Sequence, residues 1–561
     1  MTSKQDIVEK LFTKGILVSK DVLENELSES LLEKIESESD LMVLNNDYVD
    51  VIEKQACLVD WYEIDSARVH AEKERDDTLY QSQLQTFRQS SLTTDLPNTP
   101  EQQVASVETE LTNDSASFTM ERTLDEIEDI GMDNLEPLLD GPDTVVTVVV
   151  SYTNIPKKYQ PQDFAQFFLS RYRFLESLLR KRQELRSTLS IRHVLDKKDK
   201  ENVAVIGLVD EIAETRNGNL ILTLEDPTGK IKVLISKNKR DLFDQGRDLV
   251  VDEVIGIAGV SGDKIVFAET IVWPDIPQSN QIKKGPEEEY IVFLSDIHVG
   301  SHLFLEEEFG KFLQWINGGV GNEEQKAMAN AVKYVFIAGD LVDGVGIYPG
   351  QEEELSIPDI KGQYAEFSRL ISQIPKNKQI IICPGNHDAV HLAEPQPAFY
   401  QKFSEGLFEL PNVTLVTNPS LITVGKKEGF SGFDVLMYHG YSFDYYVANV
   451  PSIRLGGGYH RSDLIMKFLL KRRHLAPSFK STPYYPNHDE DPLLIKTIPD
   501  FLITGHIHYS CVANYKGVTM ISGSCWQAKT DFQEKLGHEP EPARVPIVNL
   551  KTRKIKVLRF S

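Results

Sequence analysis

Five short apolar runs in the second half of the chain are each followed directly by a cluster of polar residues. The runs cover 290–295, 334–338, 379–383, 433–438 and 501–504. The clusters that follow them are Asp296-Ile297-His298, Gly339-Asp340, Gly385-Asn386-His387-Asp388, His439-Gly440 and Gly505-His506-Ile507-His508. Apolar runs of this length, alternating with helical stretches, predict buried strands of an α/β fold. Because ligand sites in open α/β sheets collect at the carboxyl ends of the strands, we expect these clusters to meet at one place.

The clusters have the residue types of a site for two metal ions. We expect the Asp-x-His and His-x-His pairs to direct both side chains to one side of a short extended segment. We expect the glycines at positions 339, 385, 440 and 505 to let the backbone turn sharply. Imidazole mixed with carboxylate suits Mn, Fe, Zn or Ni better than Ca. Two such ions, held ~3.5–4 Å apart by a bridging carboxylate, can clamp the oxygens of a phosphoryl displacement.

At these clusters the sequence resembles the calcineurin-like metallophosphoesterases. The resemblance implies a two-sheet α/β sandwich over residues 286–561 and two divalent metal ions, Mn or Mg, with Fe or Zn as the alternatives. It implies seven metal ligands: Asp296, His298 and His508 on the first ion, Asp340 as the bridge, and Asn386, His439 and His506 on the second. It also implies two catalytic residues: His387, which orients the phosphate or protonates the leaving group, and Asp388, which orients His387.

Longer segments resemble a narrower group, the small subunits of the archaeal family D DNA polymerases. The segments that carry this resemblance are 383–398, 438–443, 521–527 and Val545-Pro546. The resemblance implies a 3′→5′ proofreading exonuclease that acts at the 3′ end of a DNA primer–template and partners a large polymerase subunit. Eukaryotic B-subunits are similar in layout but have lost the metal ligands. This sequence keeps them, which favours an active enzyme.

Residues 143–285 predict a five-stranded barrel of the OB type behind a leading helix. The expected strands are 203–213, 220–224, 231–235, 253–260 and 264–271, with turn signals such as Asn217-Gly218 between them. The expected helix is 162–185, with a core-facing stripe at Phe164, Phe168, Tyr172, Leu175 and Leu179. Because the strands carry few aromatic residues, a structural barrel and a nucleic-acid reader both stay open.

The net charge of −25 over 561 residues is concentrated at the N-terminus. Residues 1–150 hold 34 acidic and 11 basic residues, whereas residues 151–561 hold 51 and 49. Leucine and isoleucine spacing predicts a small helical interaction domain over 1–75, and the polar, acidic composition of 76–142 predicts a disordered linker. This region is a candidate contact for a sliding clamp or other replication proteins. The acidity therefore does not weigh against a DNA substrate for the rest of the chain.

Nothing in the sequence predicts a membrane or secreted protein. No run approaches the ~18 consecutive apolar residues of a membrane span, and the start of the chain lacks a secretory signal. The four cysteines form no Cys-x-x-Cys pair, which fits a reducing compartment. We therefore expect a cytoplasmic protein, and the resemblance to the archaeal polymerase subunits implies an archaeal one that associates with the nucleoid.

A basic stretch over 451–480 is the candidate DNA-binding surface. Its candidate contacts are Arg454, Arg461, Lys467, Lys471, Arg472 and Arg473, with a helix expected over 461–474. A contact with a protein partner and a simple solvated face are the alternatives. Near the clusters, Asp343 is expected to support the Asp340 loop, and Trp526 is expected to pack in the core rather than stack on a base.

Two other functions remain as alternatives to the exonuclease. In the first, the phosphoesterase fold is a catalytically silent scaffold for a polymerase subunit. In the second, the enzyme hydrolyses small phosphoesters or phosphoproteins, which the metal motif alone does not distinguish from DNA.

Overall fold

The computed structural model describes residues 17–18, 43–44, 146–152, 158–197, 199–486, 490–530, 533–534 and 539–561. The predicted helical domain over 1–75 and the predicted linker over 76–142 lie outside the described residues, apart from two short parallel strands. These strands are β1 (Leu17–Val18) and β2 (Val43–Leu44). No helix of the described part is long and apolar enough to span a bilayer.

Two six-stranded sheets form the centre of the C-terminal part. The first has the order β12-β11-β10-β9-β18-β19 and the second β16-β17-β15-β14-β13-β3. The strands of the first sheet are β9 (Tyr290–Leu294), β10 (Val332–Ala338), β11 (Gln379–Cys383), β12 (Val413–Leu415), β18 (Arg544–Asn549) and β19 (Ile555–Arg559). Those of the second are β3 (Val146–Val150), β13 (Ser420–Val424), β14 (Phe433–Met437), β15 (Phe501–Thr504), β16 (Cys511–Tyr515) and β17 (Val518–Ser522). All five apolar runs of the sequence form strands, as predicted.

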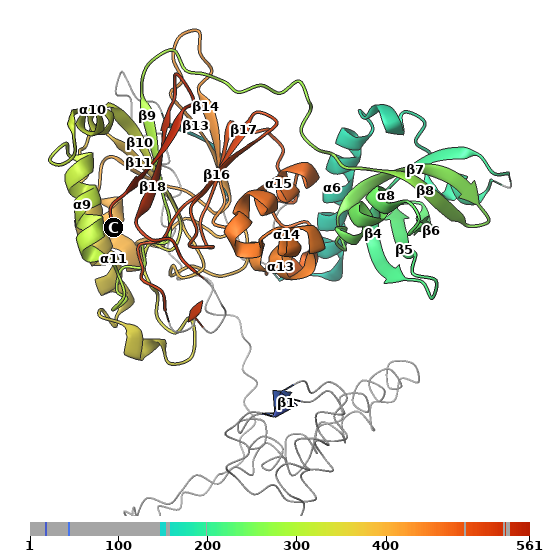
Figure 1. The fold of residues 1–561 in the computed structure, drawn as a ribbon, viewed down its shortest axis with the longest axis horizontal. Coiled ribbons are helices and arrows are strands. Elements are labelled where there is room, and N and C mark those ends of the chain that lie inside the picture. The colour runs from blue at the N-terminus through green and yellow to red at the C-terminus, as the bar shows by residue number, and fades with distance from the viewer. Residues whose placement is uncertain are drawn as a thin grey trace, which may run out of the picture. The chain divides into compact units, whose positions relative to one another are not determined.

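The two sheets share one apolar core. Phe293 on β9 and Phe501 on β15 bring the centres of their rings within 5.9 Å of each other, across the two sheets. Helices α9 (Glu306–Ile316), α10 (Glu323–Ala331) and α11 (Ile360–Ile371) cover the outer face of the first sheet (Figure 1). Helices α13 (Phe443–Asn449) and α15 (Ser462–Arg472) cover that of the second. Because both faces of the central strands are buried, these strands are apolar at nearly every position. The mixed α/β class is therefore confirmed, and the narrower calcineurin-like identification stays a prediction.

The helices of this part are mostly short. The α-helices are α9 (Glu306–Ile316), α10 (Glu323–Ala331), α11 (Ile360–Ile371), α12 (Gln401–Phe408), α13 (Phe443–Asn449), α14 (Pro451–Leu455) and α15 (Ser462–Arg472). Single 3₁₀ turns are η3 (Gln351–Glu354), η4 (Gly458–Arg461) and η5 (Phe479–Ser481). The helix expected over 461–474 is confirmed as η4 and α15.

Five strands close into a barrel with the order β4-β5-β6-β8-β7. They are β4 (Asn202–Glu214), β5 (Leu220–Asp226), β6 (Gly229–Ile235), β7 (Val254–Gly262) and β8 (Ile265–Val272), with α7 (Ile191–Leu195) and α8 (Arg240–Arg247) packed on them. Their bounds agree with the predicted strands within two residues. The closed barrel is thus confirmed, and its assignment to the OB type stays a prediction.

Three expectations for the segment before the barrel differ from the structure. Helix α6 (Pro161–Leu179) ends six residues before the predicted end, since Arg182 is extended and η2 (Gln183–Leu185) follows. Phe164, which the predicted stripe placed in the core, is 38% exposed, because the helix buries Phe167 and Arg171 instead. Strand β3, which lies at the start of the predicted barrel segment, pairs with β13 of the second sheet.

Buried ion pairs hold α6 and the barrel against the α/β part. Nε of Arg171 donates to Oδ2 of Asp491 at 2.6 Å, and Nε2 of His474 lies 2.7 Å from the same oxygen. Burial alone would raise the pKa of Asp491, but the charges of His474 and Arg171 outweigh it and lower this pKa. Burial lowers the pKa of His474 to about 4, so Arg171 is the cation of this cluster near neutral pH. Removal of Arg171 would therefore leave the buried carboxylate without its compensating charge.

We expect Arg171→Ala to destabilise the fold by about 3–5 kcal/mol, since it strands the buried charge of Asp491. The matched control is Arg180→Ala, at the end of the same helix, whose guanidinium pairs with Glu176 at the surface. That variant should change the stability by less than about 1 kcal/mol. Urea unfolding of the full chain measures both. Equal midpoints for the two variants would contradict the role given to Arg171.

Candidate metal centre

The carboxyl ends of β9 and β15 bring three predicted ligands together. Nε2 of His298 lies 3.1 Å from Nε2 of His508, and the latter lies 3.4 Å from Oδ1 of Asp296. All three side chains are buried, with at most 8% of each residue's surface exposed. These are the residues that the resemblance assigns to the first ion.

The carboxyl ends of β10, β11, β14 and β15 bring the other four ligand candidates together. Nε2 of His439 lies 3.2 Å from Oδ2 of Asp340 and 3.0 Å from Oδ1 of Asn386. Nδ1 of His506 lies 2.9 Å from the same Asn386 oxygen. Nδ1 of His439 donates to the carbonyl of Ala338 at 2.8 Å, which leaves Nε2 as the nitrogen that faces the other ligands. The seven predicted ligands thus form two adjacent groups, and five of them line one cavity of about 300 Å³: His298, Asp340, Asn386, His506 and His508.

The chemistry of these donors fits two divalent ions. Ligand atoms of Asp296, His298 and His508, and likewise of Asp340, His439 and His506, lie within 4.8 Å of one another. Imidazole nitrogens with carboxylate oxygens are a donor set for transition metals. The backbone leaves room around the carboxylates, because a Cβ atom at position 385 would lie 2.2 Å from Oδ1 of Asp340.

The glycines of the clusters have two different roles. The backbone is left-handed at Gly339 (φ 85°) and Gly440 (φ 119°), so the predicted sharp turns are confirmed there. Gly385 and Gly505 do not have positive φ. They are needed for space, since a Cβ atom at position 505 would lie 2.6 Å from Oδ2 of Asp296. Positive φ therefore marks the turns at Gly339 and Gly440, whereas lack of space for a Cβ atom explains glycine at positions 385 and 505.

The backbone at the ligands differs from the expected extended segments. Five of the seven ligands have φ between 52° and 69°: Asp296, His298, Asp340, His506 and His508. Residues other than glycine rarely adopt this left-handed region, and each instance costs about 1–3 kcal/mol. The backbone at these ligands is therefore strained, and the strain brings the side chains together at the strand ends.

Buried charge dominates the electrostatics of the site. Burial alone would raise the pKa of Asp340, but the positive charges of His439 and His387 outweigh it and hold this pKa well below its usual value. Burial alone would lower the pKa of His439, but the Asp340 carboxylate raises it to about 9. The site therefore holds ionised carboxylates and favours positive charge beside them.

The structure changes the role that the resemblance gives to Asp388. Nδ1 of His387 donates to the backbone carbonyl of Asp343 at 2.7 Å, and among the described residues no hydrogen bond joins His387 to the Asp388 carboxylate. That carboxylate instead accepts hydrogen bonds from the backbone N–H of Gly385 at 2.8 Å and the hydroxyl of Tyr364 at 3.0 Å. The prediction that Asp388 orients the His387 ring is therefore wrong. Asp388 fixes the loop that carries the ring.

Two carboxylates that the sequence analysis did not identify as metal-site partners hold ligand histidines. Oδ1 of Asp343 lies 3.1 Å from Nδ1 of His298, and Oδ2 of Asp444 lies 3.0 Å from Nε2 of His506. In both cases the ring nitrogen on the opposite side of the imidazole faces the other ligands. A carboxylate partner of this kind fixes the tautomer of a metal-binding histidine. The expectation that Asp343 supports the Asp340 loop therefore gives way to a contact with His298.

Half of the predicted DNA-binding set is engaged inside the protein. Arg472, 4% exposed, pairs with Glu253 of the barrel at 2.8 Å, and Arg473, 4% exposed, donates to two backbone carbonyls. The ammonium of Lys471 lies 3.5 Å from the centre of the Trp273 ring. Arg472 and Arg473 are buried and engaged within the protein, so the prediction that they contact DNA is wrong. Lys471 is half-buried, and its contact with DNA stays a prediction. The other three candidates are exposed: Arg454, Arg461 and Lys467.

Trp526 packs in the core, as expected. Its ring centre lies 4.8 Å from that of Phe309, and its backbone N–H donates to the carbonyl of Asp296. Trp526 therefore ties the first ligand loop to the core.

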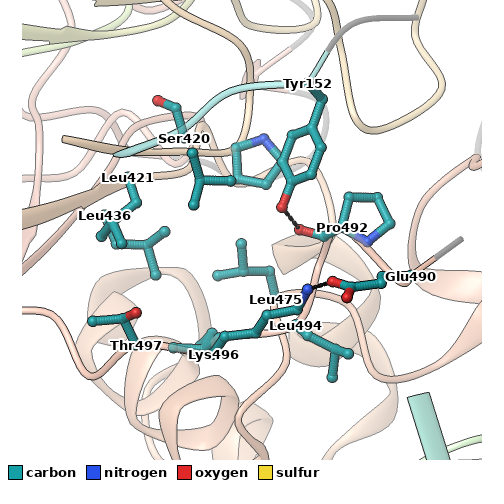
Figure 2. A pocket seen from close by; sticks show the side chains of 13 residues that line it. Tyr152, Ser420, Leu421, Leu436, Leu475, Glu490, Pro492, Leu494, Lys496 and Thr497 are labelled. Atoms are coloured by element: carbon teal, nitrogen blue, oxygen red, sulfur yellow. Dashed lines mark hydrogen bonds and ion pairs between the residues drawn. The ribbon is translucent and has the colours of Figure 1, made fainter. Parts of the chain in front are cut away.

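A second cavity of about 280 Å³ lies between β3, β13 and the segment around 490–497. Figure 2 shows the Tyr152 hydroxyl donating to the Pro492 carbonyl and an ion pair between Lys496 and Glu490. Leucine, valine and proline make up much of its wall, and its described lining contains no histidine, cysteine or aspartate. This cavity therefore lacks the ligands that the metal centre has.

Comparison with known proteins identifies the family. Residues 291–512 match the family of B-subunits of the DNA polymerases alpha and epsilon. The DNA polymerase II small subunit of Methanothermobacter thermautotrophicus is 39% identical over 399 residues, covering 71% of this chain and 79% of that protein. The chain belongs to the archaeal DNA polymerase II small subunits. This confirms the family D resemblance.

Other small subunits of this family are equally similar. Those of Pyrococcus furiosus and Archaeoglobus fulgidus are 39% and 41% identical over 71% and 69% of this chain. The alignments span 64% and 75% of those proteins, so the chain matches less than two thirds of the P. furiosus protein. A solved archaeal phosphodiesterase is a distant likeness, with 17% identity, a TM-score of 0.23, and coverage of 48% of this chain and 98% of that one.

We expect Asp343→Ala to weaken Mn²⁺ binding about 10- to 100-fold, because the Nδ1–H of His298 loses its acceptor. Titration calorimetry on the full chain measures the affinity. Asp226→Ala is the matched control, since it removes a buried carboxylate of the barrel, far along the chain from every ligand. It should leave Mn²⁺ affinity unchanged. Tight binding by Asp343→Ala would show that Asp343 does not position His298.

Glu394 is a carboxyl group buried beside Tyr438. Its Oε2 accepts a hydrogen bond from the Tyr438 hydroxyl at 3.1 Å, and Oε1 has no partner in the described part of the chain. Burial raises the pKa of Glu394 to about 7. The folded protein therefore prefers the protonated form of this group more strongly than the unfolded chain does.

We expect Glu394 to make stability depend on pH. Its contribution is full below about pH 4.5 and falls by about 3 kcal/mol as the pH rises through 7, since 1.36 kcal/mol corresponds to one pKa unit. Glu394→Gln keeps a neutral group of the same shape, so it should match the wild type at pH 4 and exceed its stability at pH 8. Urea midpoints at the two pH values measure this. If the urea midpoints of variant and wild type differ by the same amount at both pH values, Glu394 does not titrate in this range.

Proposed function

We propose that this chain is the 3′→5′ proofreading exonuclease subunit of an archaeal replicative DNA polymerase. The observation that carries the proposal is the metal centre: all seven ligand positions are filled by competent side chains, and these converge at the strand ends. A scaffold has no need for this donor set or for the strained backbone that holds it. Membership of the polymerase small-subunit family supports DNA as the phosphodiester substrate.

The chain's own groups have distinct tasks in this reaction. Asp340, which pairs with His439, would help to hold the ions, and Asp343 and Asp444 fix the rings of His298 and His506. When bound, two divalent ions would activate a water molecule and offset the charge that develops on the phosphate. The backbone carbonyl of Asp343 holds a proton on Nδ1 of His387, which leaves Nε2 toward the cavity.

His387 is the group best placed to exchange a proton with the substrate. In the neutral ring Nε2 is an acceptor that orients a hydroxyl or a protonated oxygen. When it takes up a proton, Nε2 becomes the donor that a departing 3′-oxygen requires. Burial lowers the pKa of His387, while the nearby Asp340 carboxylate opposes that shift. We infer that the ring exchanges a proton at Nε2 while the Asp343 carbonyl holds Nδ1 in place.

The partner of this chain is proposed to be the large catalytic subunit of the same polymerase, because the chain belongs to a family of small subunits. A mismatched 3′ end frays more readily than a paired one, so it enters the cavity more often. The products are nucleoside monophosphates. The scaffold function and the hydrolysis of small phosphoesters are the alternatives that the experiment below separates from this one.

We expect Asp340→Ala and His387→Ala to reduce degradation of a 3′-mismatched primer by about 100-fold or more, because they remove a metal ligand and the proton-exchanging ring. The assay uses Mn²⁺ or Mg²⁺, with and without the large subunit. Asp263→Ala, in the exposed turn between β7 and β8, is the control and should degrade the primer at the wild-type rate.

Three results would contradict the exonuclease proposal. Undiminished degradation by Asp340→Ala would place the activity elsewhere. A wild-type protein without bound metal or turnover, yet with intact binding of the large subunit, would establish the scaffold. Much faster hydrolysis of bis(p-nitrophenyl) phosphate than of any oligonucleotide would establish a phosphoesterase of small substrates.

A further inference from the structure

The metal cavity adjoins another cavity, of about 310 Å³. Tyr459 and Ile507 line both cavities, so the two meet along these side chains. Ile507 lies between the ligands His506 and His508, whereas Tyr459 belongs to η4, which precedes α15. A chain-like ligand with its end at the metal centre would therefore pass over Tyr459 into the adjoining cavity. We name these two cavities together the Tyr459 groove.

Aromatic side chains follow one another along this groove. The Tyr441 ring lies 5.8 Å from the His506 ring at the metal end. Tyr459 lies at the junction, half-buried against the core below it. Beyond it, the exposed ring of His460 meets the Tyr509 ring edge-on at 5.0 Å. Such a row offers flat faces at intervals, which is what unpaired bases stack on.

The far end of the groove has one positive group, Arg454, one acidic group, Glu539, and an apolar side chain, Leu455. Arg454 is exposed and donates one hydrogen bond to the carbonyl of Ala448, which leaves the rest of its guanidinium toward solvent. Leu455 beside it is 80% exposed. Gly457 and Gly458, both with positive φ, form part of the wall and add no side chain to fill it. Aromatic faces beside a cation in an open groove are the features of single-strand binding sites.

We propose that the Tyr459 groove binds the unpaired nucleotides that precede the 3′-terminal nucleotide, with Tyr459 as the platform for a base and Arg454 as a phosphate contact. The proposal rests on the exonuclease function, and it adds that the substrate is a single strand several nucleotides long. Paired bases cannot use these faces, because their own neighbours cover them. The groove thereby selects frayed ends over paired ones.

The affinity of the full chain for 5′-fluorescein thymidine oligonucleotides tests the groove. EDTA is present so that binding is measured without hydrolysis of the DNA. Wild type should bind an octanucleotide at least about tenfold more tightly than a dinucleotide. Tyr459→Leu, which keeps an apolar side chain against the core, should bind the octanucleotide about tenfold more weakly than wild type. Tyr459→Phe should restore tight binding, and Tyr400→Leu, an exposed tyrosine outside the groove, is the matched control.

The salt dependence of oligonucleotide binding gives a second test, in which Arg454 is substituted and Tyr459 is kept. A plot of log affinity against log salt concentration has a negative slope for a protein that contacts phosphates. Arg454→Gln should make this slope less steep by about 0.7, the value for one phosphate contact on a single strand. Unchanged octanucleotide binding in Tyr459→Leu, or no length dependence in wild type, would overturn the proposal. Unchanged DNA binding together with lost assembly with the large subunit would assign the groove to a protein partner. Failure of the exonuclease itself is measured separately, as missing turnover of a mismatched primer.

Discussion

The site depends on two carboxylates that are buried at the ends of neighbouring strands. Asp296 and Asp340 follow β9 and β10, which pair in parallel, and each is at most 1% exposed. Two negative charges this close and this buried need positive charge around them. Histidines supply part of it, and a pair of divalent ions would supply it more fully. The glycines that leave space for these carboxylates, and the carboxylates of Asp343 and Asp444 that hold the histidines, serve the same charge balance.

Much of the fold was predictable because apolar patterning reports burial. The five runs before the clusters and the five barrel strands form as expected, since each is long enough to be buried on one or both faces. Phe164 and Arg171 show the limit of that reasoning: hydrophobicity alone places Phe164 inside and Arg171 outside, and the structure does the reverse. The pairing of Arg171 with Asp491, 320 residues away in sequence, has no local signal.

The metal ligands were predictable, but their supports were not. The motif spacing identifies Asp340, yet it does not show that its φ is 53°, because a left-handed residue depends on the loops that contact it. Asp388 lies next to His387 in sequence but bonds to backbone and Tyr364 instead. Asp343 and Asp444 hold the ligand rings, although they lie 45 and 62 residues from them. Within 451–480, some basic residues are buried and others are exposed. The presence of a charge in the sequence does not show which of the two applies.

The buried pair of Arg472 and Glu253 has a consequence for how this chain can change over generations. Loss of either residue alone leaves a charge buried without its partner, whereas loss of both together can be nearly neutral. A lineage that separates the barrel from the α/β part must therefore pass through a strongly destabilised intermediate or change both positions at once. The same holds for Arg171 with Asp491. The barrel is thus expected to be inherited together with the metal centre rather than exchanged as an independent module.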